Sequence, residues 1–155
     1  MTATGPGRRL PILFLDRAGS AGAPHYHAAP VIQVGLRFDP QHGSGARAIT
    51  SPPVRPALVD TGADLNYLDE ALIGELGLPF VRNASVAGAT STVGSTSHIG
   101  HLFLHAHQHQ IETDFVSAPL RKNGRQFDVV LGILFLRLGV LHMDFPRGEF
   151  HFTLP

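Results

Sequence analysis

The chain has 155 residues, which is enough for one domain with a substantial hydrophobic core. Twelve basic residues balance twelve acidic ones, so the charge argues against nucleic acid and against an acidic membrane surface as partners. The absence of cysteine excludes disulfides and thiolate metal sites. Seventeen glycines and twelve prolines separate short aliphatic runs, a composition that predicts many short strands rather than long helices.

The N-terminal part predicts a tail and two strands. Residues 1–9 are rich in Gly, Pro and Arg and predict a flexible tail, followed by a single domain over 10–155. Residues 10–15 predict the first strand. This apolar run is too short for a signal peptide, and no stretch could span a membrane, so we expect a cytoplasmic protein without a membrane partner. Residues 31–38 alternate between apolar and polar side chains and predict the second strand.

The centre of the chain predicts a long loop, a strand and one helix. The loop over 39–53 is longer than a usual hairpin connection, and the strand over 54–59 follows it. Asp69 is a suitable N-cap for a helix that continues to Leu76, and Gly77 is a suitable stop.

The C-terminal half predicts further hairpins around one buried strand and one short helix. The first hairpin is small, β-prone and poor in large side chains, which suits a hairpin that must move. In chain order these segments are 83–100, 102–118, 127–131, 133–138 and 140–154.

A carboxylate and a tight turn follow the strand over 54–59. Asp60 comes after Leu58 and Val59, so an acid stands at the inner end of a half-buried strand, where it is poorly solvated. Gly62 allows the backbone to turn tightly, and Thr61 can brace the turn with side-chain to backbone hydrogen bonds.

The run Asp-Thr-Gly-Ala-Asp at 60–64 resembles the active-site loop of retroviral-type aspartic proteases, the retropepsins, and of their bacterial relatives. Three later features are similar to that family in order and spacing. They are the apolar-apolar-Gly segment at 129–132, the final hairpin at 141–150 and a flap tip at 87–90. Leu134 departs from the family, because an acidic residue often stands there. The resemblance implies an all-β, single-lobe closed barrel with one or two short helices, closest in type to the bacterial and cellular single-domain branch.

The resemblance also implies a mechanism that one copy of the chain cannot perform. Aspartic protease chemistry needs two carboxylates that share one proton and one water, whereas this chain has a single Asp-Thr-Gly. We therefore expect a symmetric homodimer with Asp60 from both subunits, joined through the active-site loops and the terminal strands 10–15 and 150–154. The expected activity is that of an aspartic endopeptidase acting on a peptide or protein substrate, with no metal and no cofactor.

The family pattern assigns roles residue by residue. The expected catalytic group is Asp60, Thr61 and Gly62. The expected substrate-binding group is Ala63, Asp64, Ala87, Gly88, Ala89 and Thr90. Alanine at position 63 cannot donate a hydroxyl hydrogen bond to the carboxylate, so we expect a less acidic dyad and a pH optimum in the mildly acidic range.

Ten histidines suggest a metal site, and four of them share the parity of a strand: His101, His105, His107 and His109. Imidazoles bind Zn²⁺ or Ni²⁺, but a turn expected near Gln108 would divide this face, and no further ligand is evident. We favour a polar edge strand. Two alternatives to a protease stay open: a non-catalytic dimeric domain that binds peptide or protein, and a histidine-rich metal-binding protein.

Overall fold

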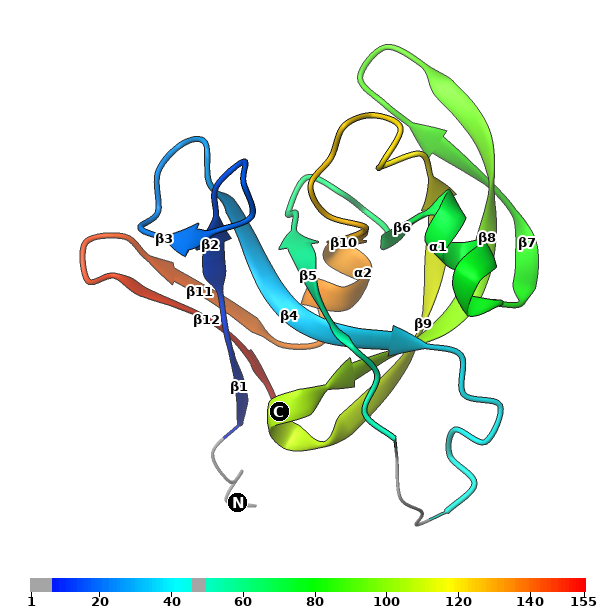
Figure 1. Cartoon of the computed structure of the whole chain (residues 1–155), viewed down its shortest axis with the longest axis horizontal. Helices are drawn as coiled ribbons and strands as arrows, with labels where there is room; N and C mark the ends of the chain where they lie inside the picture. The colour runs from blue at the N-terminus through cyan, green and yellow to red at the C-terminus, as the bar shows by residue number, and fades with distance from the viewer. Residues whose placement is uncertain (1–6, 46–49) are drawn as a thin grey trace.

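The computed structural model describes residues 7–45 and 50–155 (Figure 1). Two short α-helices, α1 (Glu70–Leu76) and α2 (Ile133–Leu136), and one 3-10 turn, η1 (His105–His107), accompany the strands in the described residues. The strands are β1 (Arg8–Pro11), β2 (Leu13–Leu15), β3 (Ala21–Gly22), β4 (Ala29–Arg37), β5 (Val54–Val59), β6 (Tyr67–Asp69), β7 (Phe80–Ala87), β8 (Thr92–Leu104), β9 (His109–Ala118), β10 (Val129–Leu131), β11 (Val140–Asp144) and β12 (Glu149–Leu154). The all-β expectation with one or two short helices is confirmed.

Six strands form a closed ring in the order β4, β5, β10, β6, β9 and β8. The long strand β4 closes the ring, because it pairs with β5 along its length and its last residues pair with β8 (Gly35↔Phe103). Its first residues also pair with β2 (Leu13↔Val31). Closure leaves few free strand edges and encloses the apolar core.

A separate three-stranded sheet joins the two ends of the chain in the order β1, β12, β11. Phe152 of β12 is fully buried and packs on Phe135 of α2 with the ring centroids 5.1 Å apart, which fixes this sheet to the barrel. Because β12 lies between β1 and β11, it has no open edge for a partner strand. The expected pairing of 150–154 across a dimer axis is therefore corrected: only the outer edges of β1 and β11 are available.

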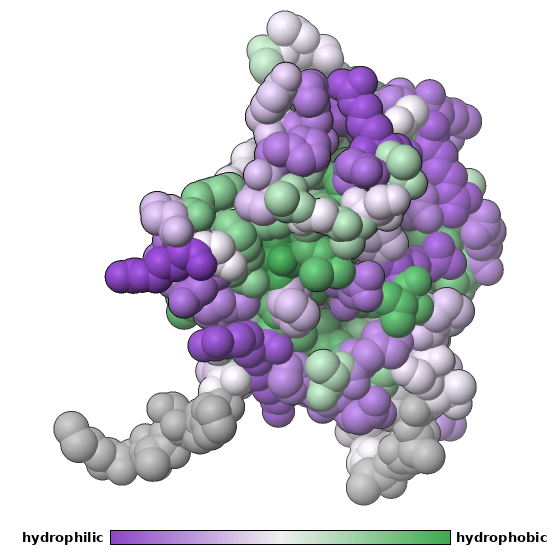
Figure 2. All heavy atoms as spheres, turned by 60° about the vertical axis from the view of Figure 1, so that its left-hand side comes forward, coloured by the Kyte–Doolittle hydropathy of each residue, from purple (hydrophilic) through white to green (hydrophobic). Residues whose placement is uncertain are grey.

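When the molecule is turned so that the left-hand side of Figure 1 comes forward, an apolar area lies in the middle of the visible face, with polar residues around it (Figure 2). An aromatic cluster links β2 to the β11–β12 hairpin. The Phe150 ring lies 4.8 Å from that of Phe14 and 5.1 Å from that of Phe145, measured between centroids. The side of Phe145 that faces solvent is large, at 58% exposure.

The helix predicted from its two caps is confirmed. The side chain of Asp69 accepts a hydrogen bond from the Ala71 N–H, and Gly77 ends α1 in the left-handed conformation at φ 62°. Leu72 and Ile73 turn inward and are buried. The local sequence therefore specifies both ends of this helix.

Two predicted boundaries are wrong at the N-terminus. The strand over 10–15 is two strands, because at Ile12 the chain leaves β12 and joins β4. Arg8 and Arg9, predicted as part of a flexible tail, belong to β1 and pair with Leu154 and Thr153. The rest of that tail, residues 1–6, lies outside the described residues, as do residues 46–49 of the predicted loop.

The interpretation of the histidine stretch as a polar edge strand is also wrong. β8 lies between β7 and β9 and pairs with β4 as well, and His101 within it is fully buried. The predicted turn is confirmed: η1 begins at His105, and Gln108 adopts a left-handed conformation. Among the residues described, no helix is both long and apolar enough to cross a membrane.

Candidate active site

Asp60 is held at the point where two central strands of the barrel run side by side. β5 and β10 are parallel, with Leu58 opposite Val130 and Val59 opposite Leu131. The Asp60 N–H donates to the Leu131 carbonyl at 3.0 Å, which continues this pairing by one residue. Val59 is buried and Leu58 is only half-buried. Since side chains alternate along a strand, Asp60 projects to the more open side that Leu58 also faces.

The turn after Asp60 is organised by the carboxylate itself. The Gly62 N–H donates to Asp60 Oδ1 at 2.9 Å, and the Ala63 N–H donates to the Asp60 carbonyl at 3.3 Å. A Cβ atom on residue 62 would lie 3.2 Å from the same Oδ1, so glycine lets the backbone approach the carboxylate closely. Among the described residues, Asp60 Oδ2 has no hydrogen-bond partner. One oxygen is thus fixed and the other is free for chemistry.

The loop is anchored from below by the glycine that ends β10. The Ile133 N–H donates to the Ala63 carbonyl at 2.8 Å, and the Leu134 N–H donates to the Asp64 carbonyl at 3.0 Å. A Cβ atom on Gly132 would collide with the carbonyl oxygens of Ala63 and Leu65. Glycine is therefore the only residue type at position 132 that allows α2 to begin so close to the loop.

Asn66 completes this anchor and is a residue that the sequence analysis missed. It is fully buried. Its Oδ1 accepts the Gly132 N–H at 3.1 Å, and its Nδ2 donates to Thr113 Oγ1 at 3.0 Å. One amide thus ties the loop to β9 and to the start of α2. An amide between Leu65 and Tyr67 in an otherwise apolar run was the available signal.

Two polar side chains of the Asp60 loop are exposed, and a partly buried tyrosine lies near them. Thr61 and Asp64 are exposed, and their side chains form no hydrogen bond or ion pair with any described residue. Tyr67 lies close enough to sense both acids: burial raises the pKa of its phenol, and the charges of Asp64 and Asp60 raise it further. The loop therefore presents a carboxylate, a hydroxyl and a second carboxylate on its open side.

The predicted flap tip is a real turn. β7 and β8 pair from Phe80 to His98, and the tip is closed by a hydrogen bond from the Gly88 N–H to the Ser91 carbonyl at 2.7 Å. The four predicted tip residues are all exposed: Ala87, Gly88, Ala89 and Thr90. The hairpin rises at the same end of the barrel as the C-terminal end of β5 (Figure 1).

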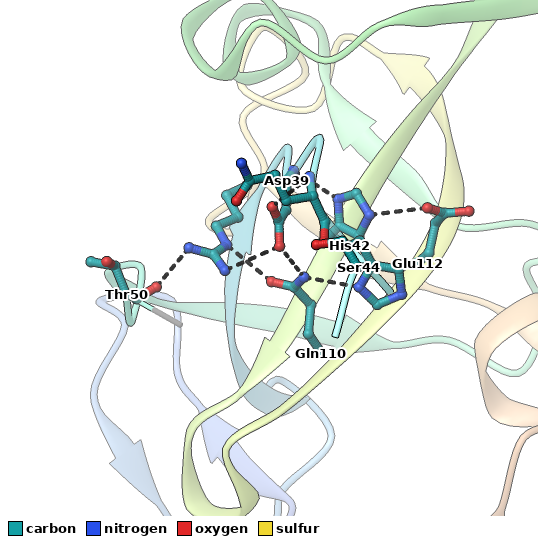
Figure 3. A network of polar contacts seen from close by, with 9 residues as sticks. Asp39, His42, Ser44, Thr50, Gln110 and Glu112 are labelled. Carbon is teal, nitrogen blue, oxygen red and sulfur yellow. Dashed lines mark hydrogen bonds and ion pairs between the residues drawn. The ribbon is translucent and has the colours of Figure 1, made fainter. Parts of the chain in front are cut away.

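A second group of polar side chains includes Asp39, His42, Gln110 and Glu112 (Figure 3). The buried His101 hydrogen-bonds to Asp39 and Glu112. Ligand atoms of His42, His101 and Glu112 lie within 4.8 Å of one another, which is close enough for a metal ion. However, His101 Nδ1 accepts the Asp39 N–H at 3.0 Å, so its ring proton belongs on Nε2, which faces Glu112 Oε2 at 3.1 Å. Histidines that bind metals instead donate a proton from the second nitrogen. His42 Nδ1 likewise accepts from Gln110 Nε2 at 3.0 Å. The hydrogen-bond pattern suits a structural network.

Comparisons with known proteins find solved structures with a similar fold. No protein-family model and no curated protein matches the sequence. The structure is similar to a crystal structure of a retropepsin-like aspartic protease from Rickettsia conorii, with a TM-score of 0.53 and 12% identity over 95% of this chain and 91% of that one. It also matches an EIAV protease complexed with the inhibitor HBY-793, with a TM-score of 0.49 and 18% identity over 75% of this chain and 92% of that one. The chain has the retropepsin-like fold.

Proposed function

We propose that this protein is an aspartic endopeptidase that works as a symmetric homodimer, with Asp60 from both copies forming the catalytic dyad. The observation that carries the proposal is the Asp60 turn: a carboxylate at the end of a central strand, with Oδ1 held by the Gly62 N–H and Oδ2 open. The fold adds support, since the Rickettsia conorii structure with the same fold is described as an aspartic protease.

Two carboxylates held a few ångströms apart cannot both ionise easily, so one stays protonated while the other is charged. The charged Asp60 removes a proton from a water as the water attacks the peptide carbonyl. The protonated Asp60 of the other copy donates a hydrogen bond to the oxygen that gains negative charge. The proton that was taken from the water then passes to the leaving amine as the peptide C–N bond breaks. Neither a metal nor a covalent intermediate is required.

The neighbouring residues take positioning and substrate-binding roles in this proposal. Gly62 fixes the carboxylate through its N–H, and the unpaired Thr61 hydroxyl is available to brace the corresponding loop of the second copy. Asp64 presents its free carboxylate to the backbone N–H groups of a bound peptide, beside Ala63. The tip at 87–90 closes over the peptide.

Apolar side chains near α2 and β11 support the assembly. Ile133, Leu138 and Val140 are large, and their exposed fractions are 43%, 40% and 67%. Ile133 lies next to the end of the Asp60 loop, because its N–H donates to the Ala63 carbonyl, and Leu138 and Val140 follow it in the chain. A second copy bound there would remove this apolar area from water and bring the two loops together.

The test is cleavage of a denatured protein and of a peptide library, with and without pepstatin, by the wild type and Asp60→Asn. Asparagine retains an Oδ1 that can accept the Gly62 N–H, so the turn should persist while the acid is lost. We expect pepstatin-sensitive cleavage that falls at least about a hundredfold in the variant. The matched control is Asp144→Asn, since Asp144 Oδ1 also accepts a turn N–H, from Arg147 at 3.0 Å. This control should retain activity.

Cleavage that persists in Asp60→Asn would overturn the proposal. Peptide binding without cleavage by the wild-type dimer would instead support the non-catalytic binding domain.

A further inference from the structure

A cavity of about 530 Å³ lies beside the strand that carries Asp60. Its apolar lining includes Leu58 of β5 and Phe127, which precedes β10. Leu58 and Asp60 are two residues apart on an extended chain, so their side chains project to the same side of the barrel. Ala28 and Ala29 complete the apolar lining. The cavity therefore opens on the side of the barrel that the Asp60 carboxylate faces.

The polar lining of this cavity is basic. Arg17, Arg125, His27 and Gln126 contribute to it, and all four are exposed at the rim. None of the described lining residues is acidic. The cavity thus combines two guanidinium groups and an imidazole with an apolar lining, a combination that favours a ligand with a short apolar stem and a negative end.

Both arginines are free to bind such a ligand. Elsewhere in the described chain, ion pairs to carboxylates engage Arg37, Arg55, Arg82, Arg121 and Arg147. Arg17 and Arg125 have no such pair with any described residue. Their acidic neighbours are committed elsewhere, since Asp16 Oδ1 accepts the N–H groups of Ala18 and Ser20, and Asp128 binds the guanidinium of Arg121. The two positive charges are therefore uncompensated by the carboxylates of residues 7–45 and 50–155.

We propose that this cavity is a specificity site that binds an acidic side chain of the peptide substrate, with Arg17 and Arg125 holding its carboxylate. The inference rests on the proposed function, because an endopeptidase places substrate side chains in the cavities next to its catalytic carboxylate. The methylene groups of a glutamate fit against Leu58 and Phe127, and its carboxylate can accept hydrogen bonds from two guanidinium groups. An uncharged glutamine of the same size keeps the apolar contacts and loses the ionic ones.

The experiment compares kcat/KM for peptides that differ only by Glu against Gln, placed in turn at each position on either side of the scissile bond. We expect one position at which Glu is preferred about tenfold, a factor that corresponds to about 1.4 kcal/mol. In the double variant Arg17→Gln, Arg125→Gln the preference should vanish. Changing both arginines to glutamate should instead favour Lys at that position.

The control variant is Arg147→Gln, which removes one guanidinium from the β11–β12 turn, outside the cavity, and should retain the preference. Equal rates for Glu and Gln peptides at every position, or a preference that survives the double variant, would overturn the inference and leave the proposed function standing. A double variant that is monomeric by sedimentation, with all peptides affected equally, would assign the cavity to a carboxylate of the second copy and also overturn it.

Failure of the wild type to cleave any peptide would count against the proposed function alone. The inference is then decided by fluorescence anisotropy with the same labelled peptides. Tighter binding of a Glu peptide, lost in the double variant, supports it, and equal binding of Glu and Gln peptides contradicts it.

Discussion

Two aspartates of this barrel, Asp39 and Asp60, occupy opposite polar environments. Asp39 is only 7% exposed, and its carboxylate accepts hydrogen bonds from Gln110 Nε2 at 2.7 Å and from the Gln41 N–H at 3.0 Å. Gln110 in turn accepts a hydrogen bond from Arg37. Asp60 is half-buried and accepts a single side-chain hydrogen bond from a described residue, at Oδ1.

The difference is between a carboxylate engaged on both oxygens and one with a single oxygen engaged by the described residues. A buried carboxylate whose lone pairs are all engaged rigidifies the fold, because any change leaves a group unpaired in a poorly solvated place. A carboxylate with one oxygen fixed and one open is held in orientation and can still accept a hydrogen bond from a ligand. We infer that the Asp39 network holds the loop after β4 against β8 and β9. We also infer that the open oxygen of Asp60 interacts with a second copy of the chain and with substrate.

Gln110→Leu tests whether the Asp39 network stabilises the fold. The substitution removes the amide that donates to Asp39 Oδ2 and accepts from Arg37 Nε, while the ion pair between Arg37 and Asp39 stays in place. We expect the free energy of unfolding to fall by about 2 to 4 kcal/mol, with activity per folded molecule retained. Chemical denaturation measures the change.

The matched control is Gln33→Leu, because Gln33 is exposed and makes no side-chain hydrogen bond with a described residue. It should change stability by less than about 0.5 kcal/mol. Equal effects of the two substitutions would remove the basis for treating the Asp39 network as structural.

The pH dependence of stability also tests the network of buried polar groups around Asp39 and His101. Burial lowers the pKa of His101 below its ordinary value of 6.5, although the hydrogen bond to Glu112 opposes this; His42 and Asp39 also face the ring. In the window just below pH 6.5 the unfolded chain binds a proton at His101 that the folded chain does not. Stability is therefore full above that pH and falls as the pH drops toward the folded pKa.

In His101→Gln that slope should be shallower. The slope cannot vanish, because burial also lowers the pKa values of His109 and His151. Free energies of unfolding measured from pH 7.5 down to pH 5 in both proteins give the comparison. Identical slopes would contradict a neutral, buried His101.

Ala63→Ser should produce a small shift in the pH dependence of the activity proposed for Asp60. A hydroxyl at this position can donate a hydrogen bond to the Asp60 carboxylate and stabilise its charged form. The acidic limb of the pH-rate profile should move down by about half a unit to one unit, with an optimum for the wild type in the mildly acidic range. Ala106→Ser, at an exposed position in η1, should leave the profile unchanged. A wild-type optimum near pH 2 would contradict this account of position 63.

Local sequence predicted the elements that depend on neighbouring residues. Residues that are close together in the sequence determine the caps of α1, the alternation in β4 and the turn that follows the strand at Asp60. The fold class came from the family resemblance of the Asp60 turn and three later motifs, and it is confirmed. The roles given to Asp60 and to the tip at 87–90 stay predictions.

Long-range pairing was outside the reach of such patterns. Arg37 and Gln110 are 73 positions apart, and the amide of Asn66 bonds to Thr113 of β9 and to Gly132, which precedes α2. Nothing in a local pattern says which polar side chains will be buried together. The pairing of β1 with β12 was missed for the same reason, because both strands carry equally plausible patterns for an intermolecular partner.

Mixed dimers test whether one active site needs Asp60 from two chains. Wild-type and Asp60→Asn chains are refolded together in equal amounts at a fixed total concentration, and peptide cleavage is compared with that of wild type alone. A dyad shared between two randomly paired chains predicts about a quarter of the wild-type activity. A residual activity of about a half would mean that each chain acts alone and would contradict the shared dyad.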